Sequence, residues 1–577
     1  MLQVLGIWVA GMMEVRFRAL WGSFKDLFLN DFTWTWRVSG QARLQTALRS
    51  ALSVLKERCS WRRWASQGNY ISMSDNLFDR LVRNTQNVYA KAIESADGKV
   101  FHYSDLFAFS SQLAGVLVDH GVKPGDRVAV QVEKSVPALV LYLASLRAGA
   151  VYLPLNTAYT LAELDYFISD SEPSVIVCDP SSAAGIGTLA QKVGAKVLTL
   201  DPSGVGSLTE LAASQPRDFS TVSRAGDDLA AILYTSGTTG RSKGAMLTHD
   251  NLFSNASTLV DYWRFQSSDV LIHALPIYHT HGLFVASNVT FFSGASMIFL
   301  PKLDPDRIMN LMERATALMG VPTFYVRLLQ HPGLNKDAVR NMRLFVSGSA
   351  PLLADTHREW QSRTGHAILE RYGMTETNMN TSNPYEGDRV PGAVGFPLPS
   401  VSVRITDPEG ADILGPEQIG MIEVKGPNVF KGYWRMPEKT AAEFKPDGFF
   451  ITGDLGKIDS RGYVHIVGRG KDLIITGGFN VYPKEIETEI DSMPGVFESA
   501  VIGVPHPDFG EGVTAVVVRT KAESIDEKAI ILALQDRLAK FKQPKKIIFM
   551  EDLPRNTMGK VQKNVLRDQF AKLYTNQ

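Results

Sequence analysis

The positions of apolar residues along the chain predict a layered α/β fold. Between about residues 98 and 467, short apolar runs that suit buried strands alternate with longer stretches of helical spacing. Residues 128–131, 175–177 and 196–200 are such runs, and residues 138–148 form such a helical stretch. This alternation is typical of parallel-rich sheets that are covered by helices.

The pattern changes near residues 468–472, after which the sequence predicts a smaller α+β unit. Its expected strands and helices lie at residues 500–504, 513–519 and 547–550, and at residues 483–490 and 526–540, respectively. Pro483 suits the first position of a helix, and Glu485 and Glu487 suit its first turn, where carboxylates favour the helix dipole. We therefore expect a large α/β part followed by a small separate part.

The first 72 residues differ from the rest of the chain. They hold six of the nine tryptophans and carry ten basic against four acidic residues. Three interpretations compete: an organelle transit peptide, an amphipathic membrane-surface segment, or sequence upstream of a true start at Met73. We favour the third, which places the protein in the cytoplasm; a transit peptide would place it in the mitochondrial matrix.

Composition excludes several classes of function. The 577 residues, 45% of them hydrophobic, suffice for at least two packed domains. Sixty basic residues balance sixty acidic ones, so no overall charge favours nucleic acid. Only Cys59 and Cys178 occur, which argues against a disulfide framework or a cysteine metal site. Residues 270–301 are uncharged and long enough for a membrane span, yet their histidines and hydroxyl residues favour a buried core.

The most informative segment is residues 235–244, with the sequence TSGTTGRSKG. It follows an apolar run at 229–234, and Thr248 beyond it suits the cap of a helix. A strand, a glycine-rich turn and a helix form a phosphate cradle, because glycine lets backbone N–H groups approach an anion closely. The spacing excludes an ordinary P-loop, since Lys243 is followed by Gly244 and not by a hydroxyl residue.

This segment resembles the phosphate-binding loop of the adenylate-forming enzymes, which include acyl-CoA synthetases, luciferases and peptide-synthetase adenylation domains. Four further motifs match the family in order. They are residues 347–351, residues 370–377, the set 433–434, 452–454 and 468–471, and residues 553–560. In the third of these, Asp454 and Arg469 are fifteen residues apart, as in the family. The resemblance covers Met73 to the end. It implies a nucleotide-binding domain at 73–470 and a mobile C-terminal domain at 471–577, which rotates about Lys471 or Asp472.

The resemblance also implies roles for individual residues. Tyr372 would form the adenine platform, Asp454 would accept hydrogen bonds from both ribose hydroxyls, and Arg469 would hold the ribose or phosphate. Glu376 would bind Mg²⁺, Lys560 would neutralise charge at the α-phosphate, and Thr235 would assist catalysis. Ser349 would border the acyl group, and coenzyme A would enter near Gly477 and Gly478. The implied nucleotide- and coenzyme-binding residues are Thr235, Ser236, Gly237, Thr238, Thr239, Gly240, Lys243, Gly348, Ser349, Ala350, Glu370, Arg371, Tyr372, Gly373, Thr375, Asp454, Arg469, Lys471, Gly477 and Gly478.

Within the family, the chain resembles the malonyl-CoA synthetases most. A second carboxylate on the substrate must be buried beside a cation, and Arg358 in the expected helix at 352–363 is the candidate. His279 and His281 are candidates for the same pocket. The resemblance implies a ligase that uses malonate or methylmalonate, ATP, Mg²⁺ and coenzyme A, and that acetylation of Lys560 by an acetyltransferase, with reversal by a deacetylase, would control it.

Two alternatives stay open at this point. A synthetase for another acyl or aryl acid would share every motif except the acid pocket. A carrier-loading module or an inactive nucleotide-binding homologue belongs to a different class. The presence of Glu376, Asp454, Arg469 and Lys560 argues against an inactive homologue.

Overall fold

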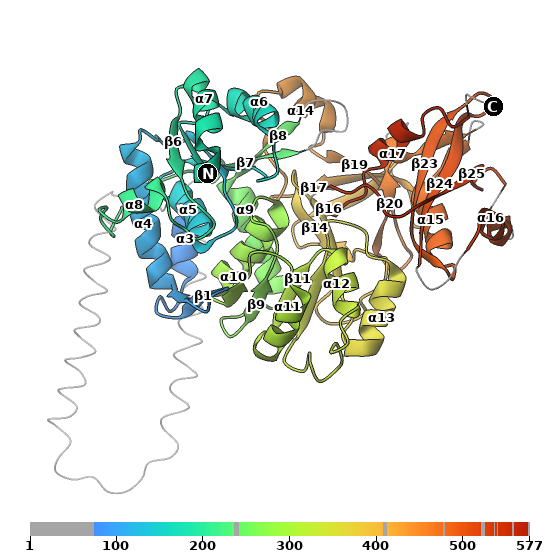
Figure 1. The fold of residues 1–577 in the computed structure, drawn as a ribbon, viewed down its shortest axis with the longest axis horizontal. Helices are drawn as coiled ribbons and strands as arrows, with labels where there is room; N and C mark the ends of the chain where they lie inside the picture. Colours follow the sequence, from blue (N-terminus) through green and yellow to red (C-terminus); the bar gives the residue numbers. More distant parts are fainter. Residues whose placement is uncertain are drawn as a thin grey trace, which may run out of the picture. The chain divides into compact units, whose positions relative to one another are not determined.

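The computed structural model describes residues 74–235, 242–407, 412–476, 479–520, 525–535, 537–538, 540–556 and 559–574. Within these residues the strands form four sheets, and most pairs in the two largest sheets are parallel (Figure 1). The α/β fold class expected from the hydrophobic pattern is confirmed. Residues 1–72, with their three interpretations, lie outside the described residues.

The larger sheet has the strand order β15-β14-β13-β12-β11-β9-β10-β1-β2. Its strands are β1 (Lys91–Ser95), β2 (Val100–His102), β9 (Val270–His273), β10 (Ser296–Phe299), β11 (Ala317–Gly320), β12 (Leu344–Ser347), β13 (Leu369–Met374), β14 (Asn378–Ser382) and β15 (Phe396–Pro397). Strands β9 to β13 are joined in parallel, so their carboxyl ends lie at one edge of the sheet.

The second sheet has the order β18-β8-β7-β4-β3-β5-β6. Its strands are β3 (Arg127–Gln131), β4 (Val151–Pro154), β5 (Val175–Cys178), β6 (Lys196–Thr199), β7 (Leu229–Thr235), β8 (Lys243–Thr248) and β18 (Gly432–Tyr433). Strands β3, β5 and β6 match the three apolar runs of the sequence. A smaller antiparallel sheet consists of β16 (Ser402–Thr406), β17 (Gly420–Lys425), β19 (Phe450–Ile458) and β20 (Val464–Arg469).

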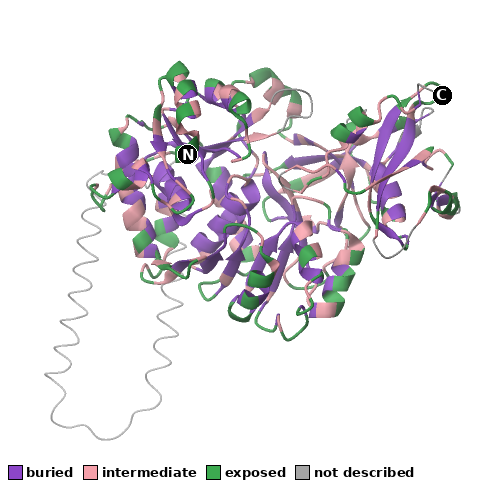
Figure 2. Cartoon of the chain, in the orientation of Figure 1, coloured by how far each residue is buried: buried purple, intermediate pink, exposed green. Residues whose placement is uncertain are grey.

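Helices cover these sheets. They are α3 (Leu77–Asn84), α4 (Tyr103–Asp119), α5 (Val136–Arg147), α6 (Leu161–Ser171), α7 (Ala183–Val193), α8 (Ser207–Ala212), α9 (His249–Tyr262), α10 (Asn288–Ser293), α11 (Pro305–Leu311), α12 (Pro322–Leu329), α13 (Ala354–Thr364) and α14 (Pro437–Glu443). Figure 2 shows that many of the strands are buried. Residues that alternate along a strand contribute to two different cores. Ala129 of β3 packs with α6 and α7, whereas Val128 and Val130 face the larger core that includes α4, α5 and α9.

The glycine-rich segment joins two strands, which corrects the expected strand–turn–helix arrangement. Thr235 at the end of β7 pairs with Lys243 at the start of antiparallel β8. The helix begins only after β8, where Thr248 accepts a hydrogen bond from the Asn251 amide and caps α9 as expected. The residues of β8 pair antiparallel with β7 and carry the chain back along that strand before α9 starts.

The C-terminal sheet has the order β22-β21-β24-β23, with β25 beside β24. Its elements are β21 (Ile474–Thr476), β22 (Phe479–Val481), α15 (Pro483–Asp491), β23 (Val496–His506), β24 (Gly510–Arg519), α16 (Glu527–Gln535), β25 (Lys546–Met550) and α17 (Lys563–Gln569). Pro483 begins α15 as expected. Helix α16 ends at Gln535, earlier than expected. Beyond it, the Gln543 side-chain amide donates to the Leu538 carbonyl at 2.8 Å.

Residues 270–301 form part of the buried core rather than a membrane span. They contribute β9, a π-helical segment at His281–Ser287, α10 and β10. In the described part of the chain, every helix is too short or too polar to cross a bilayer.

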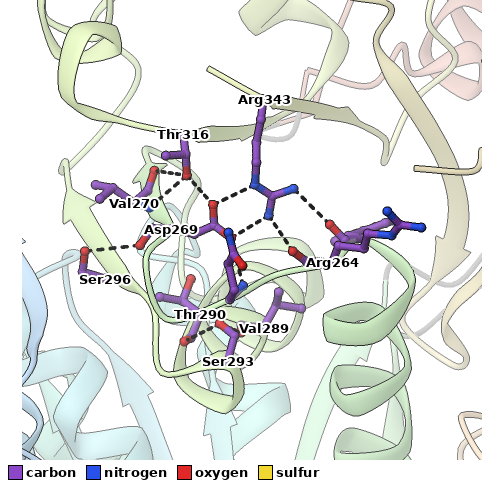
Figure 3. A network of polar contacts seen from close by, with 11 residues as sticks. Arg264, Asp269, Val270, Val289, Thr290, Ser293, Ser296, Thr316 and Arg343 are labelled. Atoms are coloured by element: carbon purple, nitrogen blue, oxygen red, sulfur yellow. Dashed lines mark hydrogen bonds and ion pairs between the residues drawn. The ribbon is translucent and has the colours of Figure 1, made fainter. Parts of the chain in front are cut away.

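A charged cluster ties together the amino ends of three parallel strands (Figure 3). Asp269, Thr316 and Arg343 directly precede β9, β11 and β12. The Asp269 carboxylate accepts hydrogen bonds from Thr316 Oγ1 at 2.7 Å and from Arg343 Nε and Nη2 at 2.7 and 2.6 Å. Arg343 also donates to the carbonyls of Trp263 and Arg264 at the end of α9. The cluster therefore sets the register of strands whose opposite ends carry the site described below.

We expect Asp269→Ala to destabilise the protein by about 3–5 kcal/mol, because removal of the buried carboxylate breaks its ion pair with the partly buried Arg343 guanidinium, which then keeps only carbonyl acceptors. Asp269 is only 1% exposed, so water cannot replace the lost carboxylate. Chemical and thermal unfolding of both proteins measures the effect, with the exposed Asp355→Ala as the control. Equal stability of Asp269→Ala and the control would contradict a structural role for the cluster.

Candidate active site

The carboxyl ends of β9 and β12 gather the candidate acid-binding residues. The loop after β9 carries His279 and His281, and the loop after β12 carries Gly348 and Ser349. Ser349 Oγ lies 3.2 Å from His281 Nδ1. Ser349 has a φ of +72°, an uncommon value for a residue with a side chain and one found often at functional sites. Ligand sites in parallel sheets form at this edge.

Buried residues of the core contact the π-helical segment that begins at His281 and fix its position. Gly282 is required there, since a Cβ would lie 1.9 Å from the Pro276 carbonyl oxygen. His273 Nε2 lies 2.9 Å from the Gly282 oxygen, and Lys134 Nζ lies 2.9 Å from His273 Nδ1. Burial lowers the pKa of His279 to about 4 and that of His281 well below its usual value. Both rings are therefore neutral at pH 7 and offer hydrogen bonds but no charge.

Arg371 supplies the positive charge that these histidines lack. It is 3% exposed, and its Nε and Nη2 atoms are among the buried polar atoms of the described chain that have no hydrogen-bonding partner. A Cβ at Gly348 would lie 2.4 Å from its guanidinium carbon. Burial lowers its pKa to about 9, and its charge acts on His281 and Tyr325. An unpaired buried cation of this kind is costly unless a ligand anion meets it.

The preceding residue, Glu370, is also buried, but unlike Arg371 its charged group has hydrogen-bonding partners. Its carboxylate lies 3.0 Å from His357 Nδ1 and accepts the Gly392 amide at 3.1 Å. Burial raises the Glu370 pKa. The Glu370 carboxylate therefore has partners within the protein, and its contacts connect β13 with α13 and with the loop at Gly392.

Arg358 does not reach this region, in contrast to the expectation from sequence. Its side chain is 63% exposed and pairs with Asp355 at 2.6 Å along α13. The buried residues of α13 are His357, Trp360 and Thr364, so helical spacing turns Arg358 toward solvent. The arginine near Ser349 and His281 is Arg371, which the sequence had assigned to the nucleotide.

Asp454 joins the expected nucleotide residues. Asp454 and Arg469 are cross-strand partners on β19 and β20, and Arg469 Nε lies 2.7 Å from Asp454 Oδ1. The Tyr372 hydroxyl donates to Asp454 Oδ2 at 2.6 Å. The spacing of fifteen residues that linked Asp454 to Arg469 in the sequence is thus the span of a β-hairpin.

Glu376 lies in the tight turn between β13 and β14. It is 5% exposed, burial raises its pKa, and the Tyr433 hydroxyl lies 3.1 Å from its Oε1 atom. Gly373 permits the turn, because a Cβ there would lie 1.8 Å from the Asn378 carbonyl oxygen. One buried carboxylate suits Mg²⁺, which binds through one or two carboxylates together with substrate phosphates. No cluster of three or more metal-ligating side chains occurs in the described chain.

Several expected residues flank this centre. Thr375 and His279 line one small cavity together with Tyr234 and Tyr278. Thr235 Oγ1 donates to the Lys243 carbonyl at 3.4 Å. Ala350 is half-buried beside Ser349. Seven expected residues lie outside the described residues: Ser236, Gly237, Thr238, Thr239, Gly240, Gly477 and Gly478.

Lys560 lies on a loop that is closed by its own hydrogen bonds. The Lys560 amide donates to Asn556 Oδ1 at 2.9 Å, and the Arg555 guanidinium donates to the Gly559 carbonyl at 2.6 Å. Desolvation and the positive charge of Arg469 lower the pKa of Lys560 to about 8, although its side chain keeps contact with solvent. The charge of Lys560 therefore interacts electrostatically with the Asp454–Arg469 pair.

The expected hinge residues precede the C-terminal sheet. Lys471 and Asp472 form a single turn of 3₁₀ helix with Gly470. Arg567 Nη1 lies 2.8 Å from Asp472 Oδ1, so Asp472 is tied to α17. Sequence reasoning did not single out Arg567 or Glu443, because charged residues on short helices give no distinctive motif.

Comparisons with known proteins agree with this geometry. A family model described as AMP-binding enzyme matches residues 80–434, and the AMP-binding enzyme C-terminal domain matches residues 485–560. A malonate–CoA ligase of Arabidopsis thaliana is 34% identical over 87% of this chain and 90% of its own length. A mitochondrial malonate–CoA ligase of Mus musculus is 37% identical over 78% and 83%.

Solved structures give the same result. The ATP-bound crystal structure of MatB from Rhodopseudomonas palustris superposes with a TM-score of 0.86 and 70% identity, over 87% of this chain and all of that one. A benzoate CoA ligase from Burkholderia xenovorans is more distant, with a TM-score of 0.78 and 26% identity over 85% and 99%. The protein described here belongs to the family of AMP-binding enzymes.

Proposed function

We propose that the protein is an ATP-dependent acid–CoA ligase that converts malonate to malonyl-CoA, with AMP and pyrophosphate as the other products. The observation that carries the choice of acid is Arg371, a buried guanidinium with two unpartnered nitrogens beside Ser349 and His281. The similarity to malonate–CoA ligases and to MatB supports the same substrate.

A dicarboxylate suits this pocket for an electrostatic reason. One carboxylate of malonate reacts, and the other needs a cation in a poorly hydrated place. His279 and His281 are neutral there, so the fork of Arg371 is the group that supplies the charge. A fatty acid would leave the Arg371 charge unpaired. Methylmalonate should also be accepted, because one methyl group discriminates weakly.

The reaction follows from the arrangement in two steps. A carboxylate oxygen attacks the α-phosphorus of ATP, the bond to the β-phosphate oxygen breaks, and pyrophosphate leaves with malonyl-AMP retained. Lys560 balances negative charge as this bond forms, and Asp454 accepts hydrogen bonds from the ribose. Glu376 would hold Mg²⁺, which neutralises phosphate charge when bound. The thiol of coenzyme A then attacks the acyl carbon and AMP leaves.

The C-terminal residues would act in both steps. We assign the rotation between them to the segment at Lys471 and Asp472, with residues 73–470 and 471–577 as the two domains. Acetylation of Lys560 would remove the charge needed in the first step, so a lysine acetyltransferase and a deacetylase are proposed partners. We place the reaction in the cytoplasm, or in the mitochondrial matrix if residues 1–72 act as a leader.

The decisive experiment measures AMP formation with ATP, Mg²⁺, coenzyme A and a panel of acids. We expect malonate to exceed acetate, octanoate and benzoate by at least about tenfold in kcat/KM, since a charge-assisted hydrogen bond contributes about 1.5–3 kcal/mol. Methylmalonate should fall within about tenfold of malonate. A higher rate with octanoate or benzoate would contradict the proposed acid, and absence of AMP with every acid would contradict the ligase function itself.

A further inference from the structure

Lys243, the one cation of the phosphate-binding segment that the structure describes, points into the protein. Its Nζ atom lies 3.0 Å from Glu443 Oε1 and 4.2 Å from the centre of the Tyr433 ring. Its side chain is 14% exposed. An ammonium group that contacts a carboxylate and an aromatic face has already found partners for its charge.

Glu443, at the end of α14, accepts hydrogen bonds from two sides. On the inner side it accepts from Lys243 and, at 2.6 Å, from the Tyr433 hydroxyl. On the outer side Lys439 lies 2.8 Å away, one helical turn earlier. Despite partial burial, these contacts lower the Glu443 pKa, so the group is a carboxylate at pH 7.

The Tyr433 hydroxyl connects this pair to the turn of Glu376. The same oxygen lies 2.6 Å from Glu443 Oε2 and 3.1 Å from Glu376 Oε1. The position of Tyr433 is fixed, because its backbone pairs with Ala245 of β8, its amide donates to Thr440 Oγ1 at 2.9 Å, and its ring packs on Phe430. Tyr433 therefore has little freedom to leave either carboxylate.

We propose that Glu443 and Tyr433 are positioning residues that join Lys243 and Glu376 into one unit of the MgATP site. The Lys243 charge then balances the two carboxylates and fixes the end of the phosphate-binding segment on β8, instead of binding phosphate itself. This inference rests on the proposed use of MgATP, and it gives a role to Glu443, which belongs to none of the motifs.

The change in MgATP affinity on Glu443→Gln distinguishes this proposal from the alternative that Glu443 keeps Lys243 away from the phosphates. If Lys243 acts through Glu443, Glu443→Gln should weaken MgATP binding about tenfold. If Glu443 instead withholds Lys243 from the phosphates, Glu443→Gln should tighten binding. Calorimetric titration of the full-length enzyme with MgATP, without acid or coenzyme A, measures this directly. Tighter or unchanged binding would overturn the proposal.

Further variants test the connection through Tyr433. Tyr433→Phe removes only the hydroxyl and keeps the ring, and it should raise KM for ATP about tenfold while KM for malonate stays within twofold. The double variant Tyr433→Phe/Glu443→Gln should bind MgATP little more weakly than either single variant, since both act in one unit. Fully additive losses, or equal increases in both KM values, would overturn the proposal.

Lys439→Ala is the matched control, because it removes the outer partner of Glu443 and leaves the contacts with Lys243 and Tyr433 in place. It should bind MgATP within twofold of the unmodified enzyme, and a tenfold loss would overturn the proposal. Thermal unfolding verifies that all variants are folded. Failure of the unmodified enzyme to bind MgATP would contradict the proposed function, whereas normal binding by every variant would contradict only this inference.

Discussion

Lys560→Ala should lose at least about a hundredfold in malonyl-AMP formation, while thioester formation from supplied malonyl-AMP stays within about threefold. A hundredfold loss corresponds to about 2.7 kcal/mol of transition-state stabilisation, which suits removal of one preorganised charge. The reason lies in the ammonium charge of Lys560, which interacts with the Asp454–Arg469 pair and would neutralise charge at the α-phosphate. Radiolabelled pyrophosphate exchange measures the first step, and release of AMP from malonyl-AMP with coenzyme A measures the second.

Two further variants test the role of the Lys560 charge. Lys560→Gln imitates the neutral side chain of an acetylated lysine and should lose the first step as Lys560→Ala does. Lys528→Ala changes an exposed lysine of α16 and should leave both steps unaltered. Equal loss of both half-reactions in Lys560→Ala would show that the lysine is not confined to adenylation.

Arg371→Met should lose between about tenfold and a hundredfold in kcat/KM for malonate and gain relative activity with butyrate or propionate. Methionine keeps much of the length of arginine but cannot meet a second carboxylate. Stability should not fall, because the guanidinium is buried with two unpartnered nitrogens and its removal relieves the cost of desolvation. Steady-state kinetics over a panel of monocarboxylates and dicarboxylates, together with thermal unfolding, measures both effects.

The control is Arg358→Ala, which removes an exposed arginine of α13 that pairs only with Asp355 among the contacts described for its side chain. It should keep the selectivity of the unmodified enzyme. If Arg371→Met unfolds the protein, Arg371 is structural. If it keeps its preference for malonate over butyrate, the acid is recognised elsewhere.

The sequence predicted strands and helices well where a single period dominated. β3, β5 and β6 and helices α5 and α15 lie where the sequence placed them. Strands β3 and β5 and helix α5 are buried along nearly their whole length, and α15 buries one face, so their apolar residues mark them clearly. The β8 strand was missed, because only Ala245, Met246 and Leu247 lie between the glycine-rich loop and the helix cap Thr248, and three apolar residues do not show whether they belong to a strand or to the start of the helix. Register and pairing, which bring Thr235 opposite Lys243, depend on the whole sheet.

The site was predictable in its motifs but not in its contacts. The spacing that connects Asp454 with Arg469 has a simple physical basis in a β-hairpin. The choice between Arg358 and Arg371 needed the structure, because a helical arginine faces solvent or core according to the rotation of its helix. The links from Glu443 to Lys243 and Tyr433 cross about 200 and 10 residues of sequence, and no local pattern marks them.

The charged cluster of Asp269, Thr316 and Arg343 has a practical consequence for engineering the substrate range of this enzyme. It fastens the strands at the end remote from Ser349, His281 and Arg371. The proposed recognition of the acid and the stability of the sheet therefore depend on separate groups of side chains. Libraries confined to the loops after β9 and β12 should yield folded variants with changed substrate ranges at a higher frequency than random mutagenesis of the whole chain.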